Sequence, residues 1–145
     1  MNLVTVDLEK ILSPGRNSLV RRIVQKSDTA ENYSSELNGL LATPACVGMA
    51  VKASIEVIDP YLPEGLISVG YGIDFRHTAP TSLGMTVSVQ ASILALEDNE
   101  VVLKIKAWDE QGEIGHGTHR RIIVEQKDLM EKAKKRTQFL TNRKM

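Results

Sequence analysis

The feature that most constrains the fold is one helical segment, residues 43–58, followed by an unbroken series of strand patterns. Thr43 is predicted to be its N-cap, because a threonine hydroxyl can accept a hydrogen bond from a free first-turn N–H. Pro44 suits the first helical position, where its missing N–H costs nothing. Small and medium apolar side chains then recur at three- and four-residue spacing. Asp59-Pro60 ends the helix, because a residue before proline avoids the α region.

The rest of the chain reads mainly as strands. Residues 85–96 alternate apolar and polar side chains with period two, which is typical of a half-buried strand. Consecutive strands without intervening helices favour the α+β class with an antiparallel sheet, in which the later strands form a meander and the sheet wraps the helix. Asp128 and Glu131 predict a capping box that opens a C-terminal helix. The predicted strands are residues 18–25, 66–76, 85–96, 101–108 and 113–124.

Length and composition exclude several classes of protein. The 145 residues predict one domain over residues 1–145, and 42% hydrophobic with 25% charged residues argues against disorder. Aromatic residues make up only 4%, so a base-stacking surface for nucleic acid is not expected. The single cysteine, Cys46, excludes a disulfide framework and favours a reducing, cytoplasmic setting. No secretory signal or membrane-spanning apolar run is recognised, so no membrane partner is expected.

Charge is unevenly distributed along the chain, although the net charge is zero. Residues 127–145 hold seven basic and two acidic side chains, so this segment carries +5 and residues 1–126 carry −5. Two interpretations are open: a patch that binds phosphates, or a solvated helix face followed by a frayed end.

The three histidines raise the question of a metal site or a catalytic base. His116 and His119 are three apart on a predicted strand and therefore point to opposite faces, which argues against a shared metal ion. His77 ends a strand just before a loop, where catalytic groups are common, and histidine is the usual general base near neutral pH. A purely structural histidine is the alternative.

The start of the helix has a similar ambiguity. Thr43 can be only a cap, or the helix N-terminus can polarise a carbonyl through the amides of Ala45, Cys46 and Val47. The same dipole could lower the pKa of Cys46, although we interpret this residue as a small buried side chain. Gly70, which with Gly72 interrupts a strand, indicates either a ligand passing close to the backbone or a bulge.

Several short motifs together resemble the hotdog-fold acyl-CoA thioesterases, most closely their fluoroacetyl-coenzyme A thioesterase branch. The resemblance spans roughly residues 15–135 and implies a five- or six-stranded antiparallel sheet wrapped around the central helix. It also implies a homodimer or dimer of dimers with active sites at the dimer interface. The motifs are Thr43-Pro44, Val47-Gly48, Pro60-Tyr61-Leu62, Val69-Gly70, His77-Thr78-Ala79-Pro80-Thr81, Gly84-Met85 and Gly115-x-Gly117-Thr118-His119-x-Arg121.

In that branch a threonine, a glutamate and a histidine act together on the thioester. The resemblance implies that Thr43 and His77 are the catalytic threonine and histidine. The glutamate is expected eight residues after the threonine, where this chain has Val51. Glu56 would point about 140° away from Val51 on the helix and cannot simply replace it. Glu36 and Asp74 are the remaining possible substitutes.

The leading hypothesis is therefore hydrolysis of a small or medium acyl-CoA thioester, slowed by Val51, with no metal and no cofactor beyond the coenzyme A of the substrate. The alternative is a non-catalytic protein that binds acyl-CoA or another small ligand, and a purely structural dimer is a third possibility. The loop with Tyr33 and Leu37 is expected to form a lid. The expected substrate-binding residues are Val51, Gly70, Cys46, Val47 and Arg120, with Met49 and Phe75 as further acyl contacts and Arg76 and Arg121 as further phosphate contacts.

Overall fold

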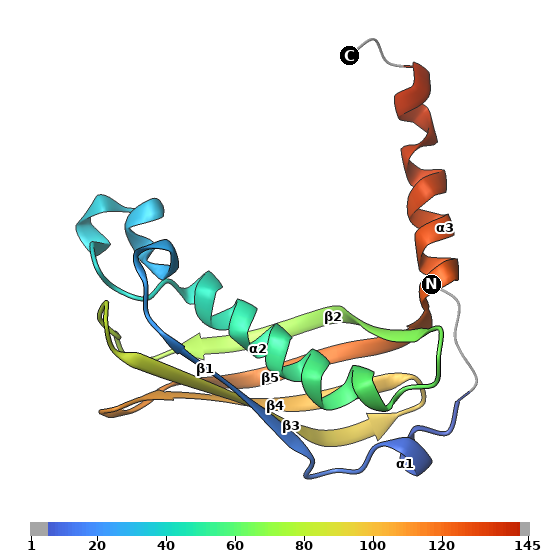
Figure 1. Ribbon diagram of the computed structural model, residues 1–145, viewed down its shortest axis with the longest axis horizontal. Coiled ribbons are helices and arrows are strands. Elements are labelled where there is room, and N and C mark those ends of the chain that lie inside the picture. Colours follow the sequence, from blue (N-terminus) through green and yellow to red (C-terminus); the bar gives the residue numbers. More distant parts are fainter. Residues whose placement is uncertain (1–5, 143–145) are drawn as a thin grey trace.

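The computed structural model describes residues 6–142, in which a five-stranded antiparallel sheet packs against one long helix (Figure 1). The expected α+β class is therefore confirmed. The helices are α1 (Leu8–Ile11), α2 (Thr43–Ile58) and α3 (Gln126–Thr137). The strands are β1 (Asn17–Ile23), β2 (Leu66–His77), β3 (Thr86–Glu97), β4 (Glu100–Asp109) and β5 (Gly112–Glu125). Short 3-10 turns are η1 (Lys26–Asp28), η2 (Ala30–Asn32), η3 (Ser35–Leu37), η4 (Asp59–Tyr61) and η5 (Gln138–Asn142).

The strand order is β1-β3-β4-β5-β2, which corrects the prediction of a four-strand meander. Only β3, β4 and β5 form hairpins in sequence, whereas β2 pairs with β5 at the sheet edge. The link after β2 crosses the strand ends instead of making a hairpin turn. Its Thr78 N–H donates to Ile114 O at 2.7 Å, and its Thr81 hydroxyl donates to Asp109 Oδ2 at 2.8 Å. These bonds hold the end of β2 against the β4–β5 turn.

The core lies between α2 and the concave face of the sheet. The helix contributes mostly small buried side chains, and the sheet contributes branched ones, so helix and sheet can approach closely. The buried members include Cys46, Met49, Ala50, Ala53 and Val57 on α2, and Val87, Val89, Ile93, Leu103, Ile105 and Ile123 on the strands.

β2 and β5 lie unusually close together near the end of β2. A Cβ built on Gly117 would lie 2.0 Å from the carbonyl oxygen of Asp74. A Cβ on Gly115 would lie 2.5 Å from the Phe75 ring. Glycine at these two positions therefore allows β5 to pair closely with the last residues of β2, which end at His77. His77 itself pairs with Gly115.

Two predicted caps are wrong, although the helices themselves are present. α2 covers Thr43–Ile58 as predicted, but Ala42 occupies the N-cap position and no side chain caps the helix. α3 begins at Gln126, so Asp128 lies inside its first turn and pairs with Lys132 at 3.6 Å instead of forming a capping box. Within residues 6–142, no helix combines the length and the apolar character needed to cross a lipid bilayer.

Candidate active site

The N-terminus of α2 and the end of β2 meet at one hydrogen bond. Thr43 Oγ1 lies 2.7 Å from His77 Nδ1, although the two residues are 34 apart in the sequence. The hydroxyl is free for this contact because Thr43 is the first helical residue and not the N-cap. Sequence reasoning named both residues, and the structure brings their side chains together.

This pair lies in a cavity of about 320 Å³. The walls are mainly apolar and come from the segment before α2 and the segment after β2. Leu37, an expected lid residue, lines the cavity, whereas Tyr33 is 74% exposed and is not part of the wall. The other lining residues are Ala30, Leu40, Leu41, Thr78, Ala79 and Pro80, none of which sequence reasoning placed in a pocket.

His77 is electrostatically suited to act as a base. Burial lowers its pKa below the ordinary 6.5, and the backbone of Ala79 only partly opposes this shift. The imidazole is therefore mainly neutral at pH 7 and can accept a proton. With the ring hydrogen on Nε2, Nδ1 accepts a hydrogen bond from the Thr43 hydroxyl. The Nε2 atom is buried and has no hydrogen-bond partner among residues 6–142.

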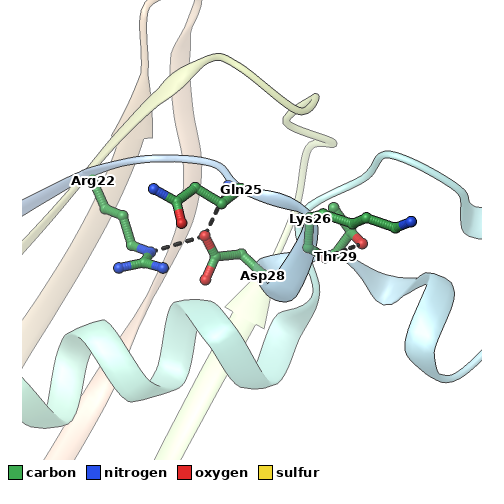
Figure 2. A network of polar contacts seen from close by, with 5 residues as sticks. All are labelled: Arg22, Gln25, Lys26, Asp28 and Thr29. Atoms are coloured by element: carbon green, nitrogen blue, oxygen red, sulfur yellow. Dashed lines mark hydrogen bonds and ion pairs between the residues drawn. The ribbon is translucent and has the colours of Figure 1, made fainter.

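The segment between β1 and α2 is anchored by a polar network at its base (Figure 2). Asp28 Oδ2 accepts hydrogen bonds from Arg22 Nε–H at 2.8 Å and from the Gln25 amide at 2.9 Å. Burial disfavours ionisation of Asp28, yet these hydrogen bonds outweigh it and hold the pKa of Asp28 below its ordinary value. The carbonyl of Asp28 also accepts from the Ala42 amide at 2.9 Å, which ties the network to the start of α2.

The first-turn amides are less available than predicted. The Ala45 and Cys46 amides both donate to Ala42 O, at 3.1 and 3.3 Å, so neither is free to polarise a bound carbonyl. Pro44 has no amide hydrogen, so the Thr43 amide is the first-turn donor that has no backbone acceptor among the described residues. The thiol of Cys46 is fully buried, and burial raises its pKa to about 11. The prediction that the helix dipole lowers the pKa of Cys46 is therefore wrong.

The other expected substrate contacts do not line this cavity within one chain. Val51 is half-buried and lies about 12 Å along α2 from Thr43, because each helical residue advances 1.5 Å. Val47 is also half-buried and absent from the cavity wall. Gly70 lies at a register shift between β2 and β5, so the structure contains the bulge that we considered there. Met49 is buried in the core instead of lining the cavity.

Two of the three arginines considered for phosphate binding have carboxylate partners. Arg120 pairs with Glu100 at 3.0 Å and Glu97 at 3.8 Å, whereas the exposed Arg76 pairs with Asp74 at 3.5 Å. Their expected contact with substrate stays a prediction.

Arg121 instead belongs to a buried structural network. It donates to Ser68 Oγ and Ser68 O, both at 2.8 Å, and Ser68 Oγ donates to Asp59. His119 Nδ1 donates to Gly72 O at 2.9 Å, so its Nε2 accepts from Arg121 Nη1 at 3.2 Å. Arg121 is only 3% exposed, so the expectation that it binds a phosphate at the surface is wrong.

No carboxylate of the described residues contacts His77. Glu56 accepts a hydrogen bond from Ser18 at 3.3 Å, Asp74 pairs with Arg76, and Glu36 is exposed. His116 and His119 are not brought together, because His116 is exposed beside Glu113 and His119 is buried. Within residues 6–142, no group of three or more His, Cys, Asp or Glu is placed to hold a metal ion.

Comparison with known proteins assigns the family. Residues 24–127 match the model of the fluoroacetyl-CoA-specific thioesterase family, FlK. The fluoroacetyl-CoA thioesterase of Streptantibioticus cattleyicolor is 33% identical over 103 residues, which cover 71% of this chain and 74% of that protein.

Solved structures of similar shape agree with this assignment. A hot-dog-like protein from Thermanaerovibrio acidaminovorans has a TM-score of 0.87 and 30% identity, covering 90% of this chain and 97% of that one. A threonine-to-serine variant of FlK in complex with acetyl-CoA has a TM-score of 0.81 and 27% identity, covering 87% and 99%. The resemblance inferred from the motifs is thus confirmed: the chain has the hotdog fold and belongs to the fluoroacetyl-CoA-specific thioesterase family.

Proposed function

We propose that the protein hydrolyses small or medium acyl-CoA thioesters at the Thr43–His77 cavity. The observation that carries the proposal is the 2.7 Å contact between a hydroxyl and a mainly neutral imidazole in the wall of an open, mainly apolar cavity of about 320 Å³. A nucleophile and a base within hydrogen-bond reach are the arrangement that nucleophilic acyl transfer requires. The apolar wall suits an acyl chain.

The chemistry proceeds in two balanced steps. Thr43 Oγ attacks the thioester carbon while its proton passes to His77 Nδ1, and the carbon–sulfur bond of the resulting tetrahedral intermediate then breaks. The departing CoA sulfur takes the proton from the imidazolium, which leaves an acyl ester on Thr43. Water then attacks this ester, His77 again accepts and returns a proton, and the carboxylic acid and the free hydroxyl are released.

Turnover is expected to be slow. An imidazolium without a carboxylate partner is less well stabilised and less firmly oriented, and loss of the carboxylate from a triad costs roughly 10⁴-fold in rate in the best-studied case. Val51 stands where the family resemblance places that carboxylate, and no acid among the described residues contacts His77. A thioester is an activated acyl group, so a threonine–histidine pair alone can still turn it over.

We further propose that the active form is a homodimer joined through β2. Its exposed middle, Gly70 to Asp74, holds Tyr71 at 65% and Ile73 at 38% exposure and includes no charge before Asp74. The opposite edge strand, β1, carries the adjacent charges Arg21 and Arg22, which discourage strand pairing. Pairing through β2 would also place the ends of both β2 strands, and therefore both His77 residues, at the dimer interface.

A second candidate function is binding of acyl-CoA without hydrolysis. The specific observation in its favour is Val51, since an aliphatic side chain can neither activate water nor orient the imidazole. This candidate keeps the cavity and the CoA ligand but gives no role to the Thr43 hydroxyl.

The two candidates separate in a thiol-release assay over a panel of acyl-CoAs. Hydrolysis by wild type, with a loss of 100-fold or more in Thr43→Val and His77→Ala, supports the thioesterase. His116→Ala is the matched control, because that exposed imidazole pairs with Glu113 and does not line the Thr43–His77 cavity. Binding of acyl-CoA without thiol release selects the binding protein. A gain of activity in Val51→Glu would show that the site lacks one catalytic group.

A further inference from the structure

α3 is the one long element that leaves the body of the protein. None of its residues is buried, and Figure 1 shows it extending beyond the β2 edge of the sheet, away from the other strands. Met130 on this helix is 55% exposed, and Leu140 in the following turn is 38% exposed. An exposed helix that also presents apolar side chains is suited to pack against another surface.

The helix is also strongly basic. α3 holds five basic and two acidic side chains, a net charge of +3. Residues 127–145 together carry +5, whereas the remainder of the chain carries −5. Lys127, Lys134, Lys135 and Arg136 are all exposed. The match to the thioesterase family model ends at residue 127, so almost all of α3 lies outside what that family model describes.

Within one chain, α3 begins far from the candidate active site. Leu66 at the start of β2 pairs with Glu125, directly before α3, whereas His77 ends the same strand. Eleven residues of strand separate them, or about 36 Å at 3.3 Å per residue. The helix cannot contribute readily to the cavity of its own chain.

Dimerisation through β2 would bring α3 of one subunit close to the cavity of the other subunit. An antiparallel pair centred on Gly72, the middle of the exposed stretch, places His77 opposite Ile67 of the partner subunit. The partner's β5 is the next strand outward, and it leads directly into the partner's α3. Two strand spacings of about 4.8 Å then separate His77 from the start of that helix, which is about 10 Å. The direction of α3 in Figure 1 agrees, since the helix extends past the β2 edge, on the side where a copy paired through β2 would lie.

We propose that α3 docks in trans beside the Thr43–His77 cavity of the second subunit, where its lysines and arginine bind the phosphates of coenzyme A. This inference rests on the proposed function, in both its dimer and its CoA ligand. CoA carries its negative charges on the nucleotide, far from the thioester, so cations at the rim of the cavity complement a bound acyl chain inside it. Flexible ammonium and guanidinium groups are the usual ligands for such phosphates.

The first test measures binding of CoA and of pantetheine, which lacks the nucleotide phosphates, by titration calorimetry on the full chain. The variant K134Q/K135Q/R136Q removes three helix cations, and K10Q/K104Q/K106Q removes three cations elsewhere as the matched control. We expect CoA binding about tenfold weaker in the helix variant only, with pantetheine binding unchanged. A change below twofold, an equal loss in the control, or a wild type that does not bind CoA would overturn the proposal.

The second test asks whether the helix acts in trans. The helix variant is co-expressed with a His77→Ala chain, and the mixed dimers are purified with two different tags. The single intact His77 then belongs to the chain whose own helix lacks the cations, so wild-type KM for acyl-CoA is expected. A KM equal to that of the helix-variant homodimer would overturn docking in trans. If wild type releases no thiol at all, the proposed catalysis fails, and the calorimetric result still decides the role of the helix.

Discussion

Gly117→Ala tests whether the close approach of β2 and β5 holds the active-site histidine in place. The added Cβ would meet Asp74 O at 2.0 Å, and the Cα of Phe75 would lie 2.9 Å away. Backbone cannot rotate away as a flexible side chain does. Carbon–oxygen contacts across a sheet are normally about 3.3 Å or longer, so the strands would have to separate by roughly 1.3 Å.

That separation sets the expected magnitude. An N–H···O bond of about 2.9 Å stretched by 1.3 Å is no longer a hydrogen bond, and about two such bonds flank the site. At about 1 kcal/mol net for each, the free energy of unfolding should fall by about 2 kcal/mol, the usual range for overpacking. The melting temperature should fall by about 4–8 °C for a chain of this size. Gly117 pairs with Phe75, two residues before His77, so kcat/KM should fall at least tenfold.

Urea and thermal unfolding followed by circular dichroism measure the first effect, and thiol release measures the second. Gly48→Ala is the matched control, because a Cβ there meets nothing within 4 Å in the middle of α2. Alanine should stabilise that helix by about 0.5–1 kcal/mol. Equal stability of Gly117→Ala and wild type would refute the argument that β2 and β5 are too close for a side chain.

Three further predictions concern charge. Because burial lowers the pKa of His77, kcat/KM should fall with decreasing pH with a midpoint below 6.5. A midpoint above 6.5 in the pH profile would contradict a half-buried, neutral base. Burial lowers the pKa of His119 too, so the unfolded chain binds more protons than the folded chain below pH 6.5. The free energy of unfolding measured in urea should therefore decrease between pH 7 and 5, by at most about 1.4 kcal/mol per pH unit for each histidine. A constant free energy of unfolding over this range would argue against the shift. Asp28→Asn should lower the free energy of unfolding only slightly but raise KM, because the anchor below the cavity loses its charge-assisted bond to the exposed Arg22. An Arg22→Gln variant that behaves differently would point to another cause.

The parts of the fold that local chemistry determines could be predicted from sequence. Pro44 and Asp59-Pro60 fix both ends of α2 within the chain itself, and the alternation in residues 85–96 identified β3 to within one residue. The position of β2 could not be predicted in this way. It depends on hydrogen bonds from Thr78 and Thr81 to residues more than 25 positions away, which no local pattern records.

In the candidate site, too, local sequence features could be predicted and long-range contacts could not. The resemblance named Thr43 and His77, but capping was the wrong local role for Thr43, because its hydroxyl contacts a residue 34 positions away. Leu37 was expected in a lid and does line the cavity, but Leu40 and Leu41 were missed because they lie in a polar segment read as a loop. Leu40 and Leu41 stand out there as apolar residues beside Leu37 without a predicted helix or strand to explain them, and that signal could have extended the expected lid to both. Of the acyl contacts expected on α2, Cys46 and Met49 pack in the core, whereas contact of the half-buried Val47 and Val51 with substrate stays a prediction.

The burial of Cys46 has a practical consequence for all of these assays. At pH 8 a thiol with a pKa of about 11 is ionised to only about one part in a thousand, and this one has no exposed surface. Aromatic disulfide reagents that report free CoA will therefore not react with the folded protein, so the enzyme contributes no background colour. The same reagent reaches Cys46 once the chain opens, and labelling rates of the single cysteine become a probe of how often each variant unfolds.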